Sequence, residues 1–247
     1  MQNELRSVWN RFFSLNWKFG LFLVLVVCIP RFALVLNANE TSDYRFIGLV
    51  MFISALVPFV FLNKRGLKQT GLRKSNKPVF LVYAFLAGLL ISYLLHLIGI
   101  GLYENTSQNW YEYIGKSYNI PAGISAGDKQ VMFLIMAVTG MTFSPVGEEL
   151  FFRGIVHHSF AKSLGDTKAS VIDAAAFALT HLSHFGLVYV NGTWDFYLLP
   201  AIIWLTGMFM VSLLFIKMKQ LTNSIWGAVL CHAGFNLGMI YCIFYLI

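Results

Sequence analysis

Charged residues are scarce in this chain. Only 12% of its 247 residues are Asp, Glu, Lys or Arg, whereas 57% are hydrophobic, and the mean hydropathy is +0.67. Soluble domains carry about 25% charged residues, so the composition excludes an ordinary soluble domain and predicts an integral membrane protein. The apolar runs are spread over the whole length, and we therefore expect a single membrane-embedded domain over 1–247.

Cysteine is equally scarce. The three cysteines, Cys28, Cys231 and Cys242, lie in apolar segments without CxxC spacing, which excludes a disulfide framework and a zinc knuckle. The HExxH signature of helical zinc proteases is absent. There is no internal repeat and no cleavable signal peptide is evident. The net charge of +7 is explained by basic cytoplasmic loops, so no nucleic acid partner is expected.

Long apolar segments indicate the fold. A helix needs roughly 20 apolar residues to span the hydrocarbon core, and seven segments approach that length. They are 17–36, 46–62, 79–102, 131–160, 169–188, 196–216 and 223–247. The sequence predicts an all-α, polytopic transmembrane bundle of seven helices, or eight if one segment is broken or re-entrant. At about 1.5 Å per residue, segment 131–160 is about 45 Å long, so we expect a tilt, or a break near Pro145 and Gly147. A second break is expected near Gly234 or Gly238.

Basic residues set the expected orientation. The 63–78 connection carries six Lys and Arg and no acid, and the 161–168 and 217–220 turns are also basic. Such loops face the cytoplasm, which places the N-terminus there too. Loops 37–45, 103–130 and 189–195 carry most of the remaining acids and are expected outside, with the aromatics at 110–113 at the membrane interface. A multi-pass protein of a bacterial plasma membrane is the expected location.

Ionisable side chains inside these segments are the candidate functional residues, since they are costly in lipid and mark functional sites. The segment "PVGEELFFRGIVHH" (145–158) is the clearest case. Glu149 and Arg153 are four residues apart, so they share a helix face and can form an ion pair. Glu148 is turned by about 100° and can act elsewhere. The plainer alternative is that both acids only neutralise the arginine.

Two other segments carry polar groups at helical spacing. Asp173, Phe177 and His181 fall on one stripe of segment 169–188, and His232 and Asn236 share a face of the last segment. A carboxylate can act as general base on water, a neutral histidine can hold that water or a metal, and a histidine–asparagine pair can stabilise an oxyanion. Together these groups suit amide hydrolysis. Ser144 and Ser183 lie near the motifs, but neither sits in a GxSxG elbow.

The order EExxxR, FxxxH and HxxxN resembles the CAAX-protease and bacteriocin-processing (CPBP, or Abi) family of intramembrane endopeptidases. Here the motifs are 148–153, 177–181 and 232–236, and the likeness places a catalytic core at about 131–240. The resemblance implies a site inside the membrane that opens toward the cytoplasmic side. It implies that Glu148 activates water with His181, that Glu149 and Arg153 organise the site, and that His232 and Asn236 stabilise the oxyanion.

The resemblance leaves the cofactor open. A glutamate-dependent reaction needs none, whereas Glu148, His181 and His232 could instead hold a divalent metal such as zinc. The implied substrate is a membrane-associated peptide or protein, in bacterial relatives a bacteriocin or pheromone leader, and lipid surrounds the chain. Oligomeric state is open. A non-catalytic scaffold that binds a sensor kinase or a peptide exporter is the alternative function, followed by a proton-coupled transporter.

Overall fold

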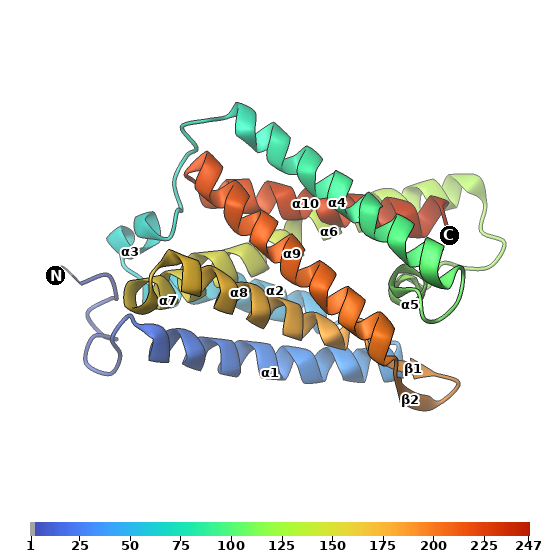
Figure 1. The fold of residues 1–247 in the computed structure, drawn as a ribbon, viewed down its shortest axis with the longest axis horizontal. Helices are drawn as coiled ribbons and strands as arrows, with labels where there is room; N and C mark the ends of the chain where they lie inside the picture. Colours follow the sequence, from blue (N-terminus) through green and yellow to red (C-terminus); the bar gives the residue numbers. More distant parts are fainter. Residues whose placement is uncertain (1–2) are drawn as a thin grey trace.

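The computed structural model describes residues 3–247, which form a bundle of helices with one short hairpin (Figure 1). The long helices are α1 (Trp17–Thr41), α2 (Ile47–Phe61), α4 (Val79–Tyr103), α6 (Ala126–Glu149), α8 (Asp166–Thr180), α9 (Leu198–Thr222) and α10 (Ile225–Tyr245). The shorter elements are α3 (Lys64–Gln69), α5 (Trp110–Gly115), α7 (His157–Leu164), the 3₁₀ turns η1 (Lys116–Tyr118) and η3 (His181–Ser183), and the π-helix η2 (Leu150–Val156). The strands are β1 (Leu187–Val190) and β2 (Thr193–Phe196).

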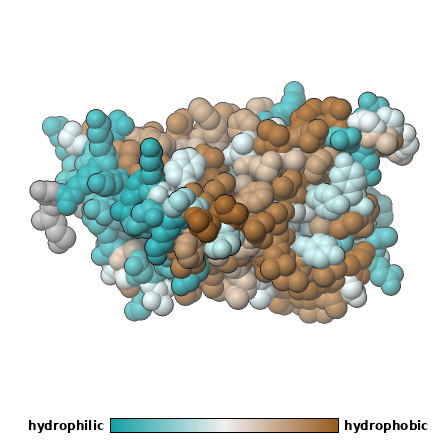
Figure 2. Space-filling view, turned by 90° about the horizontal axis from the view of Figure 1, so that it is seen from above, coloured by the Kyte–Doolittle hydropathy of each residue, from teal (hydrophilic) through white to brown (hydrophobic). Residues whose placement is uncertain are grey.

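The outer surface of the bundle is apolar. Within residues 3–247, five helical stretches are long and apolar enough to cross a membrane, and α2 is a shorter apolar helix. The five are α1, α4, the continuous stretch 126–164, α9 and α10. Large hydrophobic side chains on these helices point outward, and they cover the middle of the molecule in Figure 2. The predicted all-α membrane bundle is confirmed.

The two ends of the bundle differ in charge. One end, which we call the basic end, holds the N-terminal segment, α3 and α7 (Figure 1). Within residues 3–247 it carries thirteen Lys and Arg against two acids, Glu4 and Asp166. The opposite, acidic end holds the α1–α2 loop, α5 and the hairpin, with three basic residues against six acids. The acids there are Glu40, Asp43, Glu104, Glu112, Asp128 and Asp195.

At the basic end, the N-terminal segment is held by Glu4. Its carboxylate accepts hydrogen bonds from Lys162 at 2.8 Å and from His158 at 2.6 Å. Burial alone would raise the pKa of Glu4, but these two partners outweigh burial and hold that pKa below its usual value. His158, for which the sequence suggested no role, thus fixes the N-terminal segment to α7.

The helix expected over 169–188 is too long. Helix α8 ends at Thr180, and a hairpin occupies 187–196. Its turn, Asn191-Gly192, has positive φ at both residues (53° and 81°), the conformation that type I′ hairpin turns require. Residues 187–190 therefore form strand β1, because the following residues supply a hairpin turn.

Neither expected break is present. Helix α6 continues through Pro145 and Gly147, and the irregularity comes later, in the π-helix η2 that contains Arg153. Helix α10 is continuous through Gly234 and Gly238. Those two glycines serve close packing instead of a bend.

The crossing of α4 and α10 brings two backbones into contact. A Cβ at Gly88 would lie 1.8 Å from the carbonyl oxygen of Cys231, and one at Gly234 would lie 2.1 Å from that of Phe85. Small residues at such spacing let membrane helices approach closely. Because α10 carries His232 and Asn236, this crossing sets the position of half of the candidate site.

The aromatic residues of α5 pack inside the bundle at the acidic end, and their expected position at the level of the membrane interface stays a prediction. Trp110, Tyr111 and Tyr113 are buried. The Tyr111 hydroxyl donates to the backbone oxygen of Ser92 at 3.0 Å, and the ring of His96 lies stacked on that of Tyr111 at 6.1 Å. Helix α5 therefore packs against α4 at the acidic end.

We predict that Gly88→Ala destabilises the protein, because its Cβ has no space against α10. Overpacking of this kind costs about 1–3 kcal/mol or more. Gly101→Ala is the matched control on the same helix, since a Cβ there meets nothing within 4 Å. Thermal unfolding in detergent should show a lower midpoint for Gly88→Ala only, and equal midpoints would contradict this packing.

Candidate active site

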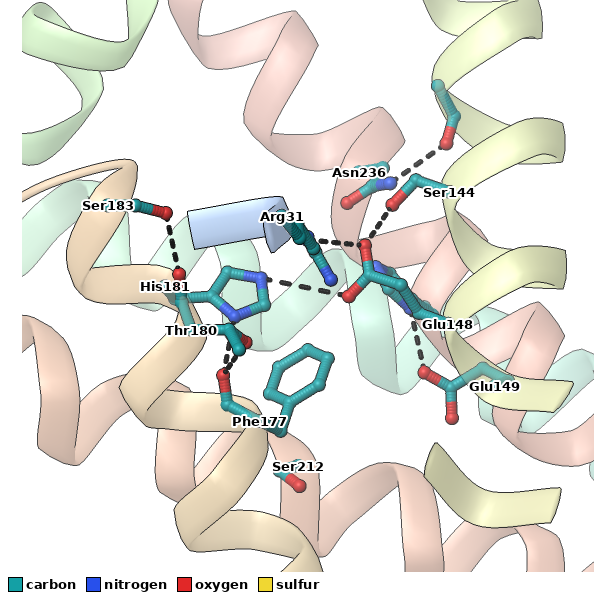
Figure 3. A network of polar contacts seen from close by, with 12 residues as sticks. Arg31, Ser144, Glu148, Glu149, Phe177, Thr180, His181, Ser183, Ser212 and Asn236 are labelled. Carbon is teal, nitrogen blue, oxygen red and sulfur yellow. Dashed lines mark hydrogen bonds and ion pairs between the residues drawn. The ribbon is translucent and has the colours of Figure 1, made fainter. Parts of the chain in front are cut away.

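Four helices bring the predicted polar residues together in the middle of the bundle (Figure 3). Glu148 and Glu149 end α6, His181 follows α8, and His232 and Asn236 lie on α10. The fourth helix, α1, contributes Arg31, which had not been predicted as a site residue. All of these side chains except that of Glu149 line one cavity of about 360 Å³.

Glu148 is held on one side only. Its Oε1 atom accepts a hydrogen bond from Nη2 of Arg31 at 3.0 Å and from Oγ of Ser144 at 2.6 Å. Its Oε2 atom is buried and has no hydrogen-bond partner. A buried carboxylate keeps its charge only if it is paired, and Arg31 supplies that partner. One oxygen is therefore fixed and the other is available.

His181 faces the available oxygen. Its Nδ1 atom lies 2.7 Å from the carbonyl oxygen of Phe177, and because a carbonyl only accepts, Nδ1 carries the proton. The neutral ring then presents Nε2 as an acceptor. Nε2 lies 3.9 Å from Oε2 of Glu148, which is too far for a direct hydrogen bond. Two acceptors thus face each other across a gap.

Glu149 points away from Glu148 and holds a different set of groups, as the predicted 100° turn requires. Its Oε1 accepts a hydrogen bond from Nδ1 of His232 at 2.8 Å. Its Oε2 lies 3.1 Å from Nε of Arg153, an ion-pair contact without hydrogen-bond alignment. The predicted Glu149–Arg153 pair is present, and it orients His232 toward the cavity.

Arg153 is completely buried and is surrounded by aromatic rings. Its guanidinium lies 4.2 Å from the ring centroid of Phe177 and 5.3 Å from that of Phe215. Nη2 donates to Oγ of Ser212 at 2.8 Å, and Nε lies 3.8 Å from Asp173. Cation–π contacts gain strength when the cation is desolvated. Arg153 therefore supports the floor of the site and does not line the cavity.

A side chain of another helix binds a backbone carbonyl of the π-helix η2 beneath the site. Lys219 of α9 donates to the carbonyl oxygen of Arg153, and the π-helix places Arg153 between α8 and α9. Such π-helical segments occur often at functional sites. Sequence spacing alone gave no sign of this element.

Asn236 binds the backbone of α6 and contacts neither glutamate by a hydrogen bond. Its amide Nδ2 donates to the carbonyl oxygen of Gly140 at 2.8 Å, which connects α10 to α6 one helical turn from Ser144. The second N–H of that amide has no partner within the described residues. Asn236 therefore retains a donor group at the wall of the cavity.

Among the residues that the sequence analysis missed, Arg31 is the most important. It is 3% exposed and lies on an apolar helix outside the three motifs. A single arginine in a membrane helix could have been noticed as a candidate partner for an acid. That its partner is Glu148 could not have been predicted, because 117 residues separate the two in the sequence.

A serine nucleophile and a bound metal are the two alternatives to a glutamate base. A GxSxG pattern does occur at 123–127, but Ser125 is exposed and caps α6 by accepting from the backbone N–H of Asp128. Within residues 3–247, no group of three or more His, Cys, Asp or Glu side chains could hold a metal ion. Nδ1 of His232 donates to Glu149 and leaves Nε2 free, an arrangement that metal-binding histidines also use, so this contact does not decide between a metal and glutamate chemistry.

We predict strong coupling between Arg31 and Glu148. Arg31→Met leaves a carboxylate unpaired in the interior, which typically costs about 3–5 kcal/mol. In the Glu148→Gln background the same change should cost much less, because no charge is left unpaired. A double-mutant cycle from unfolding in detergent measures this coupling, and additive effects would contradict the ion pair.

A comparison with known proteins finds one family model that overlaps the candidate site. Residues 130–238 match the model of the family described as type II CAAX prenyl endopeptidase Rce1-like. The match contains every predicted site residue, whereas Arg31 lies outside it. The chain matches no curated protein and no solved structure. Residues 130–238 of this membrane protein are therefore similar to the type II CAAX prenyl endopeptidase Rce1-like family.

Proposed function

We propose that this chain hydrolyses a peptide bond with a water molecule held between Glu148 and His181. The observation that carries the proposal is the pair of acceptors that face each other 3.9 Å apart. Two acceptors repel unless a donor lies between them, and water has two protons to donate. Polar groups at this separation can be bridged by one water.

This arrangement leaves the water ready to attack. With both protons directed at Oε2 of Glu148 and Nε2 of His181, the lone pairs of its oxygen point into the cavity. Glu148 takes one proton as the oxygen attacks the carbonyl carbon of the substrate. The tetrahedral intermediate then collapses, the C–N bond breaks, and the amine leaves with the transferred proton.

Residues of α10 stabilise the oxyanion of the tetrahedral intermediate. Asn236 has an N–H group at the cavity wall. His232 uses its Nδ1 proton on Glu149, so it donates to an oxyanion through Nε2 only as the imidazolium, which the Glu149 carboxylate stabilises. Fixed donors aimed at the developing negative charge stabilise the transition state. Glu149 and Arg153 act as positioning residues, because they hold His232 and the floor of the site without lining the cavity.

The substrate that we propose is a membrane-associated peptide of the bacteriocin or pheromone leader type, or a related CAAX-type peptide. The apolar outer surface keeps the protein in the bilayer, and a cavity of about 360 Å³ has room for a few residues of an extended chain. The similarity of residues 130–238 to that family supports peptide cleavage as the reaction class.

Purified wild type should cleave a member of a panel of leader and CAAX-type peptides, read by mass spectrometry. We predict that Glu148→Gln lowers kcat by about 10²–10⁴-fold, the range of a general base, and that His181→Ala also lowers it. Glu104→Gln, on the exposed acidic end, is the control. If folded Glu148→Gln cleaves as wild type does, the proposed base is wrong.

A chelator distinguishes glutamate-dependent from metal-dependent hydrolysis. Without a metal in the site, activity should persist in EDTA at concentrations that strip zinc from proteins. Loss of activity in EDTA with recovery on added zinc would contradict the glutamate mechanism and favour the metal set Glu148, His181 and His232.

A further inference from the structure

The cavity at Glu148 extends toward only one end of the bundle. Its inner wall is formed by buried residues such as Phe215 and His232, and its outer wall by half-buried Tyr44, Ile47 and Ser117. Tyr44 and Ile47 lie at the α1–α2 connection, and Ser117 lies in η1. All three are at the acidic end.

A second, polar cavity continues the first one outward. It has a volume of about 230 Å³ and shares Tyr44, Ile114, Ser117 and His184 with the site cavity. It also contains Glu40, Ser42 and Lys116, which lie at the surface. The two cavities therefore adjoin at the acidic end, where four residues line both.

The opposite direction is closed. Toward the basic end, the residues that follow Glu149 are packed on all sides, and Phe151, Phe152, Ile155 and Val156 are each at most 1% exposed. Arg153 and its aromatic neighbours occupy the space beneath the site. No described cavity lined by Glu148 reaches the basic end.

The charge asymmetry orients this route. Thirteen Lys and Arg lie at the basic end and three at the acidic end, and the end of a membrane protein with more Lys and Arg faces the cytoplasm. The resemblance to the family implied a cytoplasmic opening, yet the cavity mouth and the basic loops are at opposite ends. The two expectations cannot both hold.

We infer that the substrate enters from the non-cytoplasmic side, through the mouth formed by the α1–α2 loop and α5–η1. This inference rests on the proposed function for the identity of the reacting site. The substrate class is then an exported or membrane-anchored peptide whose scissile bond lies on the outer side of the membrane.

The lining indicates which residues flank the bond. Between the mouth and Glu148 the cavity is lined by the methionines Met51, Met136, Met208 and Met239. Methionine is flexible and polarizable, so it adapts to varied apolar partners. The polar outer cavity suits the peptide backbone. An extended segment with apolar residues next to the bond, without strict sequence preference, fits this route.

The mouth is held in shape by hydrogen bonds. The Tyr44 hydroxyl donates to Oδ1 of Asn39 at 3.0 Å, and Nδ2 of Asn39 donates to the carbonyl oxygen of Ser183 at 2.8 Å. Burial raises the pKa of Tyr44 to about 12, so its hydroxyl stays a donor. The loop is therefore tied to the element that carries His181.

Cysteine labelling from one side of the membrane tests the inference. The three native cysteines are buried, which keeps the background low. In intact cells, a membrane-impermeant maleimide should label Ser117→Cys. The control Lys68→Cys, which is exposed at the basic end, should be labelled only after the cells are lysed. Labelling of Ser117→Cys only after lysis would overturn the proposed side of entry.

Cleavage after labelling tests the route itself. The protein would be purified, reconstituted in sealed liposomes and given the cleaved panel peptide from outside. Labelled Ser117→Cys should lose at least tenfold in cleavage relative to its own unlabelled form, and labelled Lys68→Cys should lose none. Full activity of labelled Ser117→Cys would overturn the route.

The two proposals fail differently in these assays. Labelling does not require activity, so outside labelling of Ser117→Cys together with unimpaired cleavage by Glu148→Gln would reject the catalytic proposal and leave the outward opening. Labelling of Ser117→Cys only after lysis, together with loss of cleavage by Glu148→Gln, would reject the proposed side of entry and leave the catalytic proposal.

Discussion

The structure depends on the pairing of charges in an apolar interior. Two adjacent carboxylates cannot stay ionised in a buried bundle unless each has its own cation. Glu148 is paired with Arg31 of α1, and Glu149 with Arg153 one turn along. Because the two cations come from different helices, the pairing pins α1 against α6 and fixes the direction of both acids. The orientation of His232, the position of the floor and the availability of Oε2 of Glu148 follow from it.

The side chains of the site are held rigidly, and the proposed water molecule is its one mobile component. Carbonyl, carboxylate and hydroxyl groups fix the rings and charges around Glu148, and the close crossing of α4 and α10 fixes the helix that carries His232 and Asn236. Catalysis by preorganised groups needs such support, since they must be in place before charge develops. The closed basic side and the open acidic side then allow the substrate only one approach.

Spacing within one helix could be predicted from the sequence, and contacts between distant helices could not. The i, i+4 pair of Glu149 and Arg153 and the divergence of Glu148 follow from helical geometry. The partnership of Arg31 with Glu148 depends on how α1 docks, and no local pattern encodes that. The run 185–190 is apolar and reads equally as helix or strand, so only the Asn191-Gly192 turn distinguishes them. Gly234 and Gly238 read as a break because a flexible backbone and a close packing contact have the same sequence signature.

The central claim is that one water, bound by Glu148 and His181, is the nucleophile. An experimental structure at a resolution that shows ordered water tests it most directly. The account predicts density for a water oxygen within about 2.6–3.2 Å of both Oε2 of Glu148 and Nε2 of His181, and loss of that density in His181→Ala. A metal ion bound by Glu148 and His181, or direct contact between the two side chains, would contradict it.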